Sequence, residues 1–443
     1  MRRGQIGLSR RHWLKTVGTA ALTLAHARRA GAGTGRRPNV ILVLADDLGY
    51  GDLGSYGGRM IATPALDAMA AEGARLTDFY ASANICTSSR AGLMTGRYPI
   101  RTGLAHGVIM PSDDRGLPPS EVTLAEALKP HYATALIGKW HLGHVDPYWP
   151  PTRQGFDLFF GLPYSHDMTP LSLYASAPGV ELTREDVDYH RLTQRFFERG
   201  LRFIEQHRDR PFFLLLALSA PHLPLDPHPD FAGRSRAADY GDVVEEVDAN
   251  IAVLRRRLAE LALSEQTLVI VTSDNGPWFE GSVGPLRDRK GGAGWDGGYR
   301  VPFLACQPGT IPAGLVSHEI AMNIDLLPTL VAWTGMPTPD VTLDGRDITA
   351  LLTRPGAPSP HEELILFNNE HVAGLRTSRW KLVTRSYYRS LEIPFEKYGA
   401  PLLFDVRADP AETYNLASRY PDVVVNLRQR LEAAREALGA PAP

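Results

Sequence analysis

The sequence predicts an α/β protein with a largely parallel central sheet and helices on both faces, followed by a smaller C-terminal antiparallel sheet with a packed helix. Its 443 residues suffice for one large and one smaller folded part. Up to about Asp344, uninterrupted apolar runs of strand length alternate with helical patterns, as expected for buried strands joined by helices. Beyond Asp344 the apolar segments are short, alternate with polar residues and are joined by turns, which indicates an antiparallel sheet.

In the first part of the chain, strands are predicted where apolar residues continue without interruption. These runs are residues 40–45, 132–137, 212–218 and 268–271. A helix is predicted to begin at Thr63, because an N-cap residue is followed there by proline at the first helical position. Thr123 and Glu126 have capping-box spacing and predict a second helix, which reaches Lys129. Apolar residues at helical spacing predict a long amphipathic helix over 243–261.

The C-terminal sheet is predicted from four short segments of alternating polarity. These segments are residues 363–367, 373–376, 380–384 and 402–406. An amphipathic pattern over 421–438 predicts the helix that packs on this sheet. We therefore divide the chain after its N-terminal segment into an α/β domain, residues 36–344, and a smaller α+β subdomain, residues 345–443.

The N-terminal segment, residues 1–35, has the features of an export signal and a polar link. Arg10 and Arg11 form a twin arginine, and a weakly apolar stretch over 16–27 ends in a small-x-small pattern. This arrangement predicts export by the twin-arginine route, and therefore a periplasmic or secreted protein. The apolar stretch is shorter than the ~20 residues that a membrane span needs, and no later segment reaches that length. We therefore expect no membrane span in the mature chain.

Composition excludes some partners and draws attention to one cysteine. A formal net charge of -2 gives no general reason to expect nucleic acid as a partner. The 2 cysteines, Cys86 and Cys306, do not make a disulfide scaffold. Cys306 adjoins an apolar run and is interpreted as a buried, inert thiol. Cys86 lies among polar and basic residues, which indicates a chemical role.

Polar side chains follow strand after strand at the sheet edge where open parallel sheets bind ligands. These side chains are Asp46, Asp47, Cys86, Arg90, Lys139, His141, His222, Asp274 and Asn275. Four of them offer only oxygen ligands, which select calcium or magnesium over zinc: Asp46, Asp47, Asp274 and Asn275. The basic ones, together with Lys290, suit a compact tetrahedral anion such as sulfate or phosphate. The residues therefore predict metal-assisted hydrolysis of a sulfate or phosphate ester, without deciding which.

Several motifs, in their order along the chain, resemble those of the sulfatase family. The stretch 86–97, which begins Cys-Thr-Ser-Ser-Arg, is similar to the sulfatase signature. Its companions are residues 138–143, 220–222, 273–276 and 297–302, and residues 403–416 are similar to the C-terminal pattern of the family. The resemblance implies an arylsulfatase-like enzyme that hydrolyses a sulfate ester to an alcohol or phenol and inorganic sulfate.

The resemblance also implies a role for each site residue. Cys86 would be oxidised to formylglycine, whose hydrate attacks sulfur. A calcium ion would be held by the oxygen-bearing side chains and the modified cysteine, namely Asp46, Asp47, Asp274, Asn275 and Cys86. The remaining roles fall to basic and polar side chains: Arg90 and His141 support the hydrate, Lys139, Lys290 and Ser165 bind the sulfate, and His222 protonates the leaving group.

The chain departs from the family pattern at two points, and two alternative functions stay open. The signature usually has proline or alanine where this chain has Ser88, and the spacing from Lys290 to the next aromatic residue is one longer than usual. One alternative is a phosphate or phosphonate ester hydrolase on the same site. The other is a non-catalytic, calcium-dependent binder of sulfated glycans, if Cys86 is not converted. The expected partners are a small-molecule or glycan sulfate ester and a formylglycine-generating or maturation enzyme.

Overall fold

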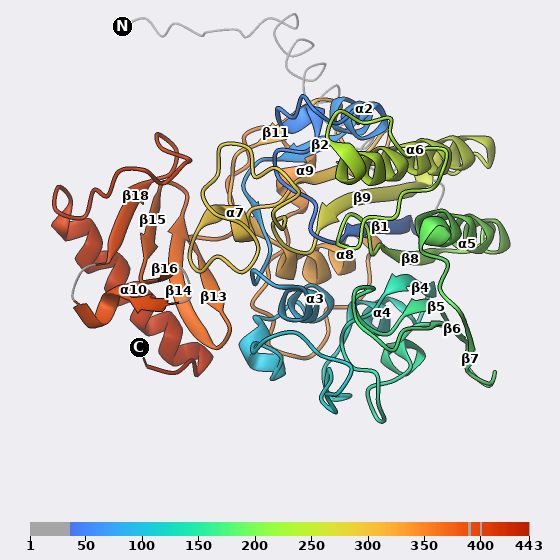
Figure 1. Cartoon of the computed structure of the whole chain (residues 1–443), viewed down its shortest axis with the longest axis horizontal. Coiled ribbons are helices and arrows are strands. Elements are labelled where there is room, and N and C mark those ends of the chain that lie inside the picture. Colours follow the sequence, from blue (N-terminus) through green and yellow to red (C-terminus); the bar gives the residue numbers. More distant parts are fainter. Residues whose placement is uncertain (1–35, 389–390, 399–400, 443) are drawn as a thin grey trace, which may run out of the picture. The chain divides into compact units, whose positions relative to one another are not determined.

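A ten-stranded mixed sheet forms the centre of the larger part of the chain (Figure 1). The computed structural model describes residues 36–388, 391–398 and 401–442, and the predicted export signal lies outside them. The sheet has the order β11-β2-β10-β9-β1-β8-β4-β5-β6-β7. In chain order the strands are β1 Asn39–Ala45, β2 Ala74–Leu76, β4 Ala133–Lys139, β5 Leu158–Leu162, β6 Leu173–Ser176, β7 Thr183–Glu185, β8 Phe212–Ala217, β9 Thr267–Ser273, β10 Phe303–Cys306 and β11 Leu315–Ser317. The central strands from β9 to β5 are all parallel, which confirms the predicted sheet, while β10, β6 and β7 run antiparallel to their inner neighbours.

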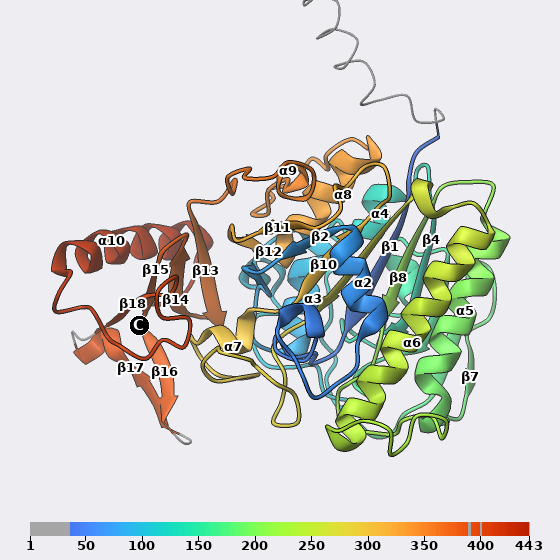
Figure 2. The same ribbon diagram turned by 90° about the horizontal axis from the view of Figure 1, so that it is seen from above.

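Helices cover both faces of this sheet. As a result, β1 and its neighbours are buried on both sides. Side chains of β1 alternate between two hydrophobic cores, with Val40 and Leu42 in one and Ile41 and Val43 in the other. Figure 2 shows one group of helices, α2 Pro64–Glu72, α5 Leu192–Gln206 and α6 Ala238–Glu260, on one side of the sheet. On the other side lie α4 Leu124–Leu128, α8 Leu326–Thr334 and α9 Thr349–Thr353, and α3 Cys86–Thr95 packs into the same core. Within the part of the chain that the structure describes, no helix combines the length and the apolarity needed to cross a membrane.

The smaller sheet near the C-terminus is antiparallel, as predicted. Its strands lie in the order β13-β14-β15-β18, with bounds β13 Glu363–Asn368, β14 His371–Thr377, β15 Trp380–Val383 and β18 Leu402–Asp405. Helix α10, Pro421–Leu438, packs on it through Leu427 and Leu431. Two further strand pairs are β3 Phe79–Tyr80 with β12 Ala321–Met322, and β16 Arg385–Tyr388 with β17 Leu391–Pro394. The remaining elements are α7 Asp296–Tyr299 and short 3-10 helices at Gly54–Tyr56, Pro99–Thr102, Pro151–Gln154, Tyr189–Arg191, Ser264–Gln266, Asn323–Asp325 and Phe395–Tyr398.

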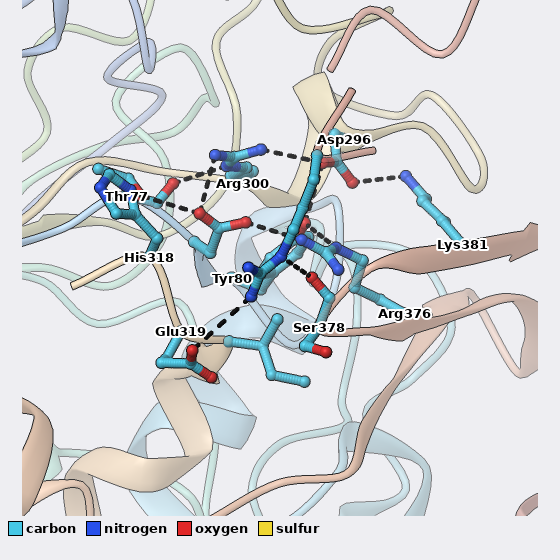
Figure 3. Close-up of polar contacts among 12 residues, drawn as sticks. Thr77, Tyr80, Asp296, Arg300, His318, Glu319, Arg376, Ser378 and Lys381 are labelled. Atoms are coloured by element: carbon cyan, nitrogen blue, oxygen red, sulfur yellow. Dashed lines mark hydrogen bonds and ion pairs between the residues drawn. The ribbon is translucent and has the colours of Figure 1, made fainter. Parts of the chain in front are cut away.

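A buried ionic network joins the two sheets (Figure 3). Lys381 of β15 places its Nζ 2.5 Å from Oδ1 of Asp296, the first residue of α7. Arg376 of β14 pairs with Asp78 at 2.7 Å, and Arg300 reaches the other oxygen of Asp78 at 3.0 Å. A buried charge that loses its partner destabilises the fold strongly. These ion pairs therefore fix the small sheet to Asp296 and to Asp78.

Candidate active site

The carboxyl ends of the neighbouring parallel strands β1 and β9 carry four oxygen-bearing side chains. Asp46 and Asp47 follow β1, Asp274 and Asn275 follow β9, and none of them is more than 2% exposed. The backbone N–H of Asp47 donates to Oδ1 of Asp274 at 3.2 Å, and Nδ2 of Asn275 donates to Oδ1 of Asp47 at 2.7 Å. Burial, together with the charge of Asp46, raises the pKa of Asp274 to about 6. The strand register thus brings these residues into one cluster.

Helix α3 brings two further predicted residues to this cluster. Cys86 is its first residue, is 2% exposed, and has its Sγ 3.5 Å from Oδ1 of Asp46. Arg90 follows one turn later on the same face, where Nε donates to Oδ2 of Asp274 at 3.0 Å and Nη1 donates to the carbonyl of Lys139 at 3.0 Å. Burial raises the pKa of the Cys86 thiol, so the unmodified side chain stays protonated at neutral pH and is a poor nucleophile.

Two lysines from distant parts of the chain pair with the carboxylates. Lys139, the last residue of β4, lies 2.5 Å from Oδ2 of Asp46 and donates to Oγ of Ser165 at 3.1 Å. Lys290 lies in a loop and approaches Oδ2 of Asp47 to 2.7 Å. Burial alone would raise the pKa of Asp46, but Lys139 and the other cations around it hold that pKa well below its ordinary value. The cluster therefore holds three carboxylates beside several fixed positive charges.

Glycines at the strand ends allow the close packing on which the position of Lys139 depends. Gly138 has φ 118°, and a Cβ built there would lie 1.8 Å from the carbonyl oxygen of Ala217 in β8. A Cβ on Gly161 of β5 would in turn lie 1.8 Å from the carbonyl oxygen of Gly138. No other residue type fits either position without displacing the backbone that carries Lys139.

Two histidines face the same cluster as neutral rings. His141 is 1% exposed, and its Nε2 donates to the carbonyl of Ile109 at 3.0 Å, which leaves a buried, unpartnered Nδ1. Nδ1 of His222 donates to the carbonyl of Leu223 at 2.6 Å, and its Nε2 lies 3.7 Å from Oδ2 of Asp47. Burial lowers the pKa of both histidines, well below the ordinary value for His141. Because a carbonyl can only accept, each ring presents a free lone pair on its other nitrogen.

The donor atoms of this cluster fit a divalent cation. Asp46, Asp47, Cys86 and His222 each place one potential ligand atom within 4.8 Å of the others. Oδ1 of Asn275 is buried without a hydrogen-bond partner, so it is available to a cation. Mostly oxygen donors suit a hard ion. His222 belongs to this group, although the sequence predicts that it is a proton donor.

Both departures from the family pattern can be located. Lys290 contacts Asp47 despite its longer spacing, and its backbone N–H donates to the carbonyl of Pro277 at 3.0 Å. Ser88 is buried in α3, and its Oγ donates to the carbonyl of Ala105 at 3.1 Å. The hydroxyl of Ser88 therefore has a partner within the fold.

A cavity of about 340 Å³ opens onto the cluster. Its most buried lining residues are Asp47, Cys86, His141 and Ser165, with His222 and Lys290 beside them. Other lining residues come from irregular loops and include Asp167, Met168, Trp278 and Glu280, none of which the sequence analysis identified. The loops that contain these four residues have no periodic pattern. The one sequence feature that could have indicated them is that each follows a predicted site residue within a few positions.

Comparison with known proteins agrees with this geometry. Residues 38–336 match the Sulfatase family model, and residues 294–437 match the model of the C-terminal region of N-sulphoglucosamine sulphohydrolase. Arylsulfatase A of Homo sapiens is 40% identical in an alignment 461 residues long. The alignment covers 93% of this chain and 90% of that protein. The chain belongs to the sulfatase family.

Other sulfatases are similar over most of this chain. The steryl-sulfatase of Mus musculus is 33% identical in an alignment 510 residues long. The alignment covers 90% of this chain and 81% of that protein. The crystal structure of the PsFucS1 sulfatase from Pseudoalteromonas sp. superimposes with a TM-score of 0.83 at 29% identity, covering 97% of this chain and 95% of that one. The predicted class of enzyme, a sulfuric ester hydrolase, is confirmed.

Proposed function

We propose that this sulfatase hydrolyses a sulfate monoester to an alcohol or phenol and inorganic sulfate, with a formylglycine made from Cys86 as nucleophile and calcium as cofactor. The position of Cys86 supports this proposal: it lines the cavity, begins a helix, and lies beside Asp46. Formylglycine hydrate would supply one hydroxyl to attack sulfur and a second on the same carbon to release sulfate. An unmodified thiol has no second hydroxyl and is protonated here, so it would not turn over.

Calcium would be held by the cluster at the ends of β1 and β9. The proposed ligands are Asp46, Asp47, Asp274, Asn275 and the modified Cys86. When bound, the cation would polarise a sulfate oxygen and offset the negative charge of the substrate. Magnesium would meet the same oxygen donors, but it demands a more regular octahedral geometry than calcium does.

The basic residues provide fixed positive charge and proton transfer. Lys139 and Lys290 bind the sulfate oxygens, with Ser165 as a further donor beside Lys139. His141 uses its free Nδ1 to take a proton from the nucleophile, and Arg90 holds Asp274 in place. His222 presents Nε2 to the cavity, takes up a proton from solvent at that atom, and then donates it to the leaving oxygen.

The remaining expectations concern maturation and location, and they stay predictions. We propose that a formylglycine-generating or maturation enzyme converts Cys86, and that the signal in residues 1–35 directs twin-arginine export to the periplasm or beyond. Residues 36–344 would then form the catalytic domain and residues 345–443 the C-terminal subdomain.

The nucleophile is tested by the mass of the tryptic peptide that contains Cys86. Conversion gives a lighter peptide than cysteine does. We expect Cys86→Ala to reduce turnover of an aryl sulfate to background while circular dichroism stays unchanged, because the smaller side chain is accommodated at the start of α3. Cys86→Ser is the matched control for side-chain size. A fully unconverted peptide, together with binding of sulfated glycans and no turnover, would support the non-catalytic alternative instead.

Matched substrates distinguish sulfate from phosphate chemistry. We expect 4-nitrophenyl sulfate to be hydrolysed with a higher kcat/KM than 4-nitrophenyl phosphate, because family membership favours sulfate. The reverse order in the converted protein would establish the phosphate or phosphonate hydrolase.

The cation is tested without using turnover. After treatment with a chelator, calcium at 100 times its Kd is expected to raise the free energy of unfolding by about 2.7 kcal/mol. Asp46→Asn should abolish most of this gain, since it removes one proposed ligand charge, and magnesium should give a smaller gain at equal concentration. Equal unfolding curves with and without calcium would contradict the proposed cofactor.

A further inference from the structure

The walls of the catalytic cavity differ in character from its floor. Exposure rises from Cys86 at 2% to Trp278 at 42%, which distinguishes a buried floor from an open rim. Outside the floor the lining is mainly apolar, with side chains from four separate segments: Val108, Met168, Pro221, Leu223 and Trp278. The ring of Trp278 meets that of the exposed Phe279 edge to face at 4.8 Å. An exposed aromatic side chain at the mouth of an apolar cavity suits a flat, apolar leaving group.

Charge is also divided between floor and rim. The cationic lining residue, Lys290, and the two histidines lie around Cys86, whereas the two exposed carboxylates of the lining, Asp167 and Glu280, lie at the rim. Among the residues that the structure describes, neither of these carboxylates has a hydrogen-bond or ion-pair partner. Their negative charge is therefore directed at whatever occupies the outer part of the cavity.

Two arginines hydrogen bond to backbone carbonyls of rim residues. Arg115 donates to the carbonyl of Val108 at 2.8 Å and pairs with Asp113 at 3.3 Å. Arg289 donates to the carbonyl of Trp278 at 3.1 Å and stacks on Phe279. Neither guanidinium lines the cavity. A leaving group with a second sulfate or a carboxylate would thus find no basic side chain beyond the floor.

We propose that the rim selects aryl monosulfates whose far end is neutral or cationic, and that Asp167 and Glu280 disfavour substrates with a second anionic group. This inference rests on the proposed sulfatase function and narrows its substrate class. An aromatic ring would contact Trp278 and Met168, while an ammonium or hydroxyl group beyond the ring would meet the two carboxylates. Sulfated glycans with several anionic groups are then poor substrates.

The test uses three sulfates that share one phenyl ring and a two-carbon linker, which ends in an ammonium group, a hydrogen atom or a carboxylate. These are tyramine O-sulfate, 4-ethylphenyl sulfate and 3-(4-sulfooxyphenyl)propanoate. Because the methylenes insulate the phenol, differences in kcat/KM report on the rim. We expect kcat/KM for the cationic substrate to be about five-fold higher than for the anionic one at low ionic strength. This ratio of the two kcat/KM values should shrink at about 1 M salt.

Variants connect this ratio to the two carboxylates. The double variant Asp167→Asn/Glu280→Gln should bring the ratio of cationic to anionic substrate close to the value in high salt. Glu181→Gln removes an exposed carboxylate that does not line the cavity and should leave the ratio unchanged. Trp278→Ala should raise KM for all three substrates alike, by up to about ten-fold.

The outcomes separate this inference from the function on which it rests. If all three sulfates are hydrolysed with equal or reversed order, or if the double variant keeps the ratio of the parent, the rim does not select by charge while the sulfatase function stands. If the converted protein hydrolyses none of the three but does hydrolyse an alkyl sulfate ester, this inference is wrong while the sulfatase function stands; if it hydrolyses no sulfate ester at all, both are wrong.

Discussion

Two site residues adopt the left-handed backbone conformation that residues with a side chain usually avoid. Asp47 has φ 68° and His141 has φ 61°, and each lies two residues beyond the end of its strand, β1 or β4. Such a conformation costs about 1–3 kcal/mol and persists only where the surrounding contacts enforce it. Here those contacts are the hydrogen bonds from Asp47 to Asp274 and from His141 to Ile109. Both turns direct their side chains to the cavity beside Cys86.

Lys290→Ala is the sharpest test of sulfate binding at the level of one residue. Loss of one preorganised cationic donor is expected to lower kcat/KM for an aryl sulfate by about 10²-fold. Folding is checked by circular dichroism, because Lys290 also pairs with the buried Asp47 and its side chain is only 12% exposed. Lys129→Ala removes another lysine that has a surface ion pair with Asp157 and should leave kcat/KM unchanged. An unchanged kcat/KM in Lys290→Ala would remove this residue from the sulfate site.

At the residue scale, the sequence identifies site residues that directly follow a predicted strand. It does not identify cavity residues whose position depends on the path of a loop. Asp46 and Asp274 could be placed together because each follows a strand in a parallel sheet. Trp278 and Glu280 could not, because their position at the cavity depends on the path of an irregular loop.

Helix α6 contains a buried carboxyl group, that of Glu246. Glu246 is 2% exposed, and Oε2 accepts from the backbone N–H of His228 at 2.9 Å while Oε1 has no partner. Burial raises the pKa of Glu246 to about 7. The folded carboxyl thus keeps its proton to a higher pH than the unfolded one, whose pKa is about 4.5. Ionisation of Glu246 therefore destabilises the fold progressively as the pH rises from about 4.5 to 7.

Glu246→Gln should remove that pH dependence. In the parent, this one group is expected to lower the free energy of unfolding by on the order of 3 kcal/mol across that window. The variant should be more stable than the parent at pH 8 and nearly equal to it at pH 4.5, measured by urea unfolding at both values. Glu245→Gln, at the adjacent and more exposed position, is the matched control. Parallel pH profiles for Glu246→Gln and the parent would show that Glu246 is not the source.

Elements with a clear period or cap could be predicted, and short or flanking elements could not. The helix predicted over 243–261 is α6, which begins earlier, at Ala238, because its first turn has no apolar face to reveal it. Helix α5 is not among the helices predicted from the sequence, although its apolar residues recur at helical spacing. Strands β7, β10 and β11 have three or four residues each, too few for a pattern.

At the scale of the whole molecule, the small sheet and the active-site loop share one set of buried charges. Lys381 pairs with Asp296 at 2.5 Å and with Oε1 of Glu412 at 2.7 Å, and Glu412 also accepts from the backbone N–H of Asp296 at 2.9 Å. Asp296 ends the loop that carries Lys290. The small sheet thus holds one end of a loop that reaches the catalytic cavity.

Lys381→Met should therefore weaken the whole fold. It leaves Asp296 and Glu412 buried beside each other without their shared cation, which is expected to cost about 3–5 kcal/mol of unfolding free energy. The triple variant Lys381→Met/Asp296→Asn/Glu412→Gln should recover much of this loss, because no unpaired charge stays buried. Lys397→Met, at an exposed lysine, serves as the control in chemical unfolding followed by tryptophan fluorescence. A stability equal to that of the parent would show that the two sheets do not depend on this lysine.

The burial of Cys86 also sets a chronology. A side chain that is 2% exposed, at the base of a cavity of about 340 Å³, cannot enter the active site of another protein once the chain has closed around it. The proposed conversion of Cys86 would therefore require a maturation enzyme to meet this segment while the polypeptide is still open. Folding would then enclose the modified side chain, and the proposed transport of a folded protein would come last.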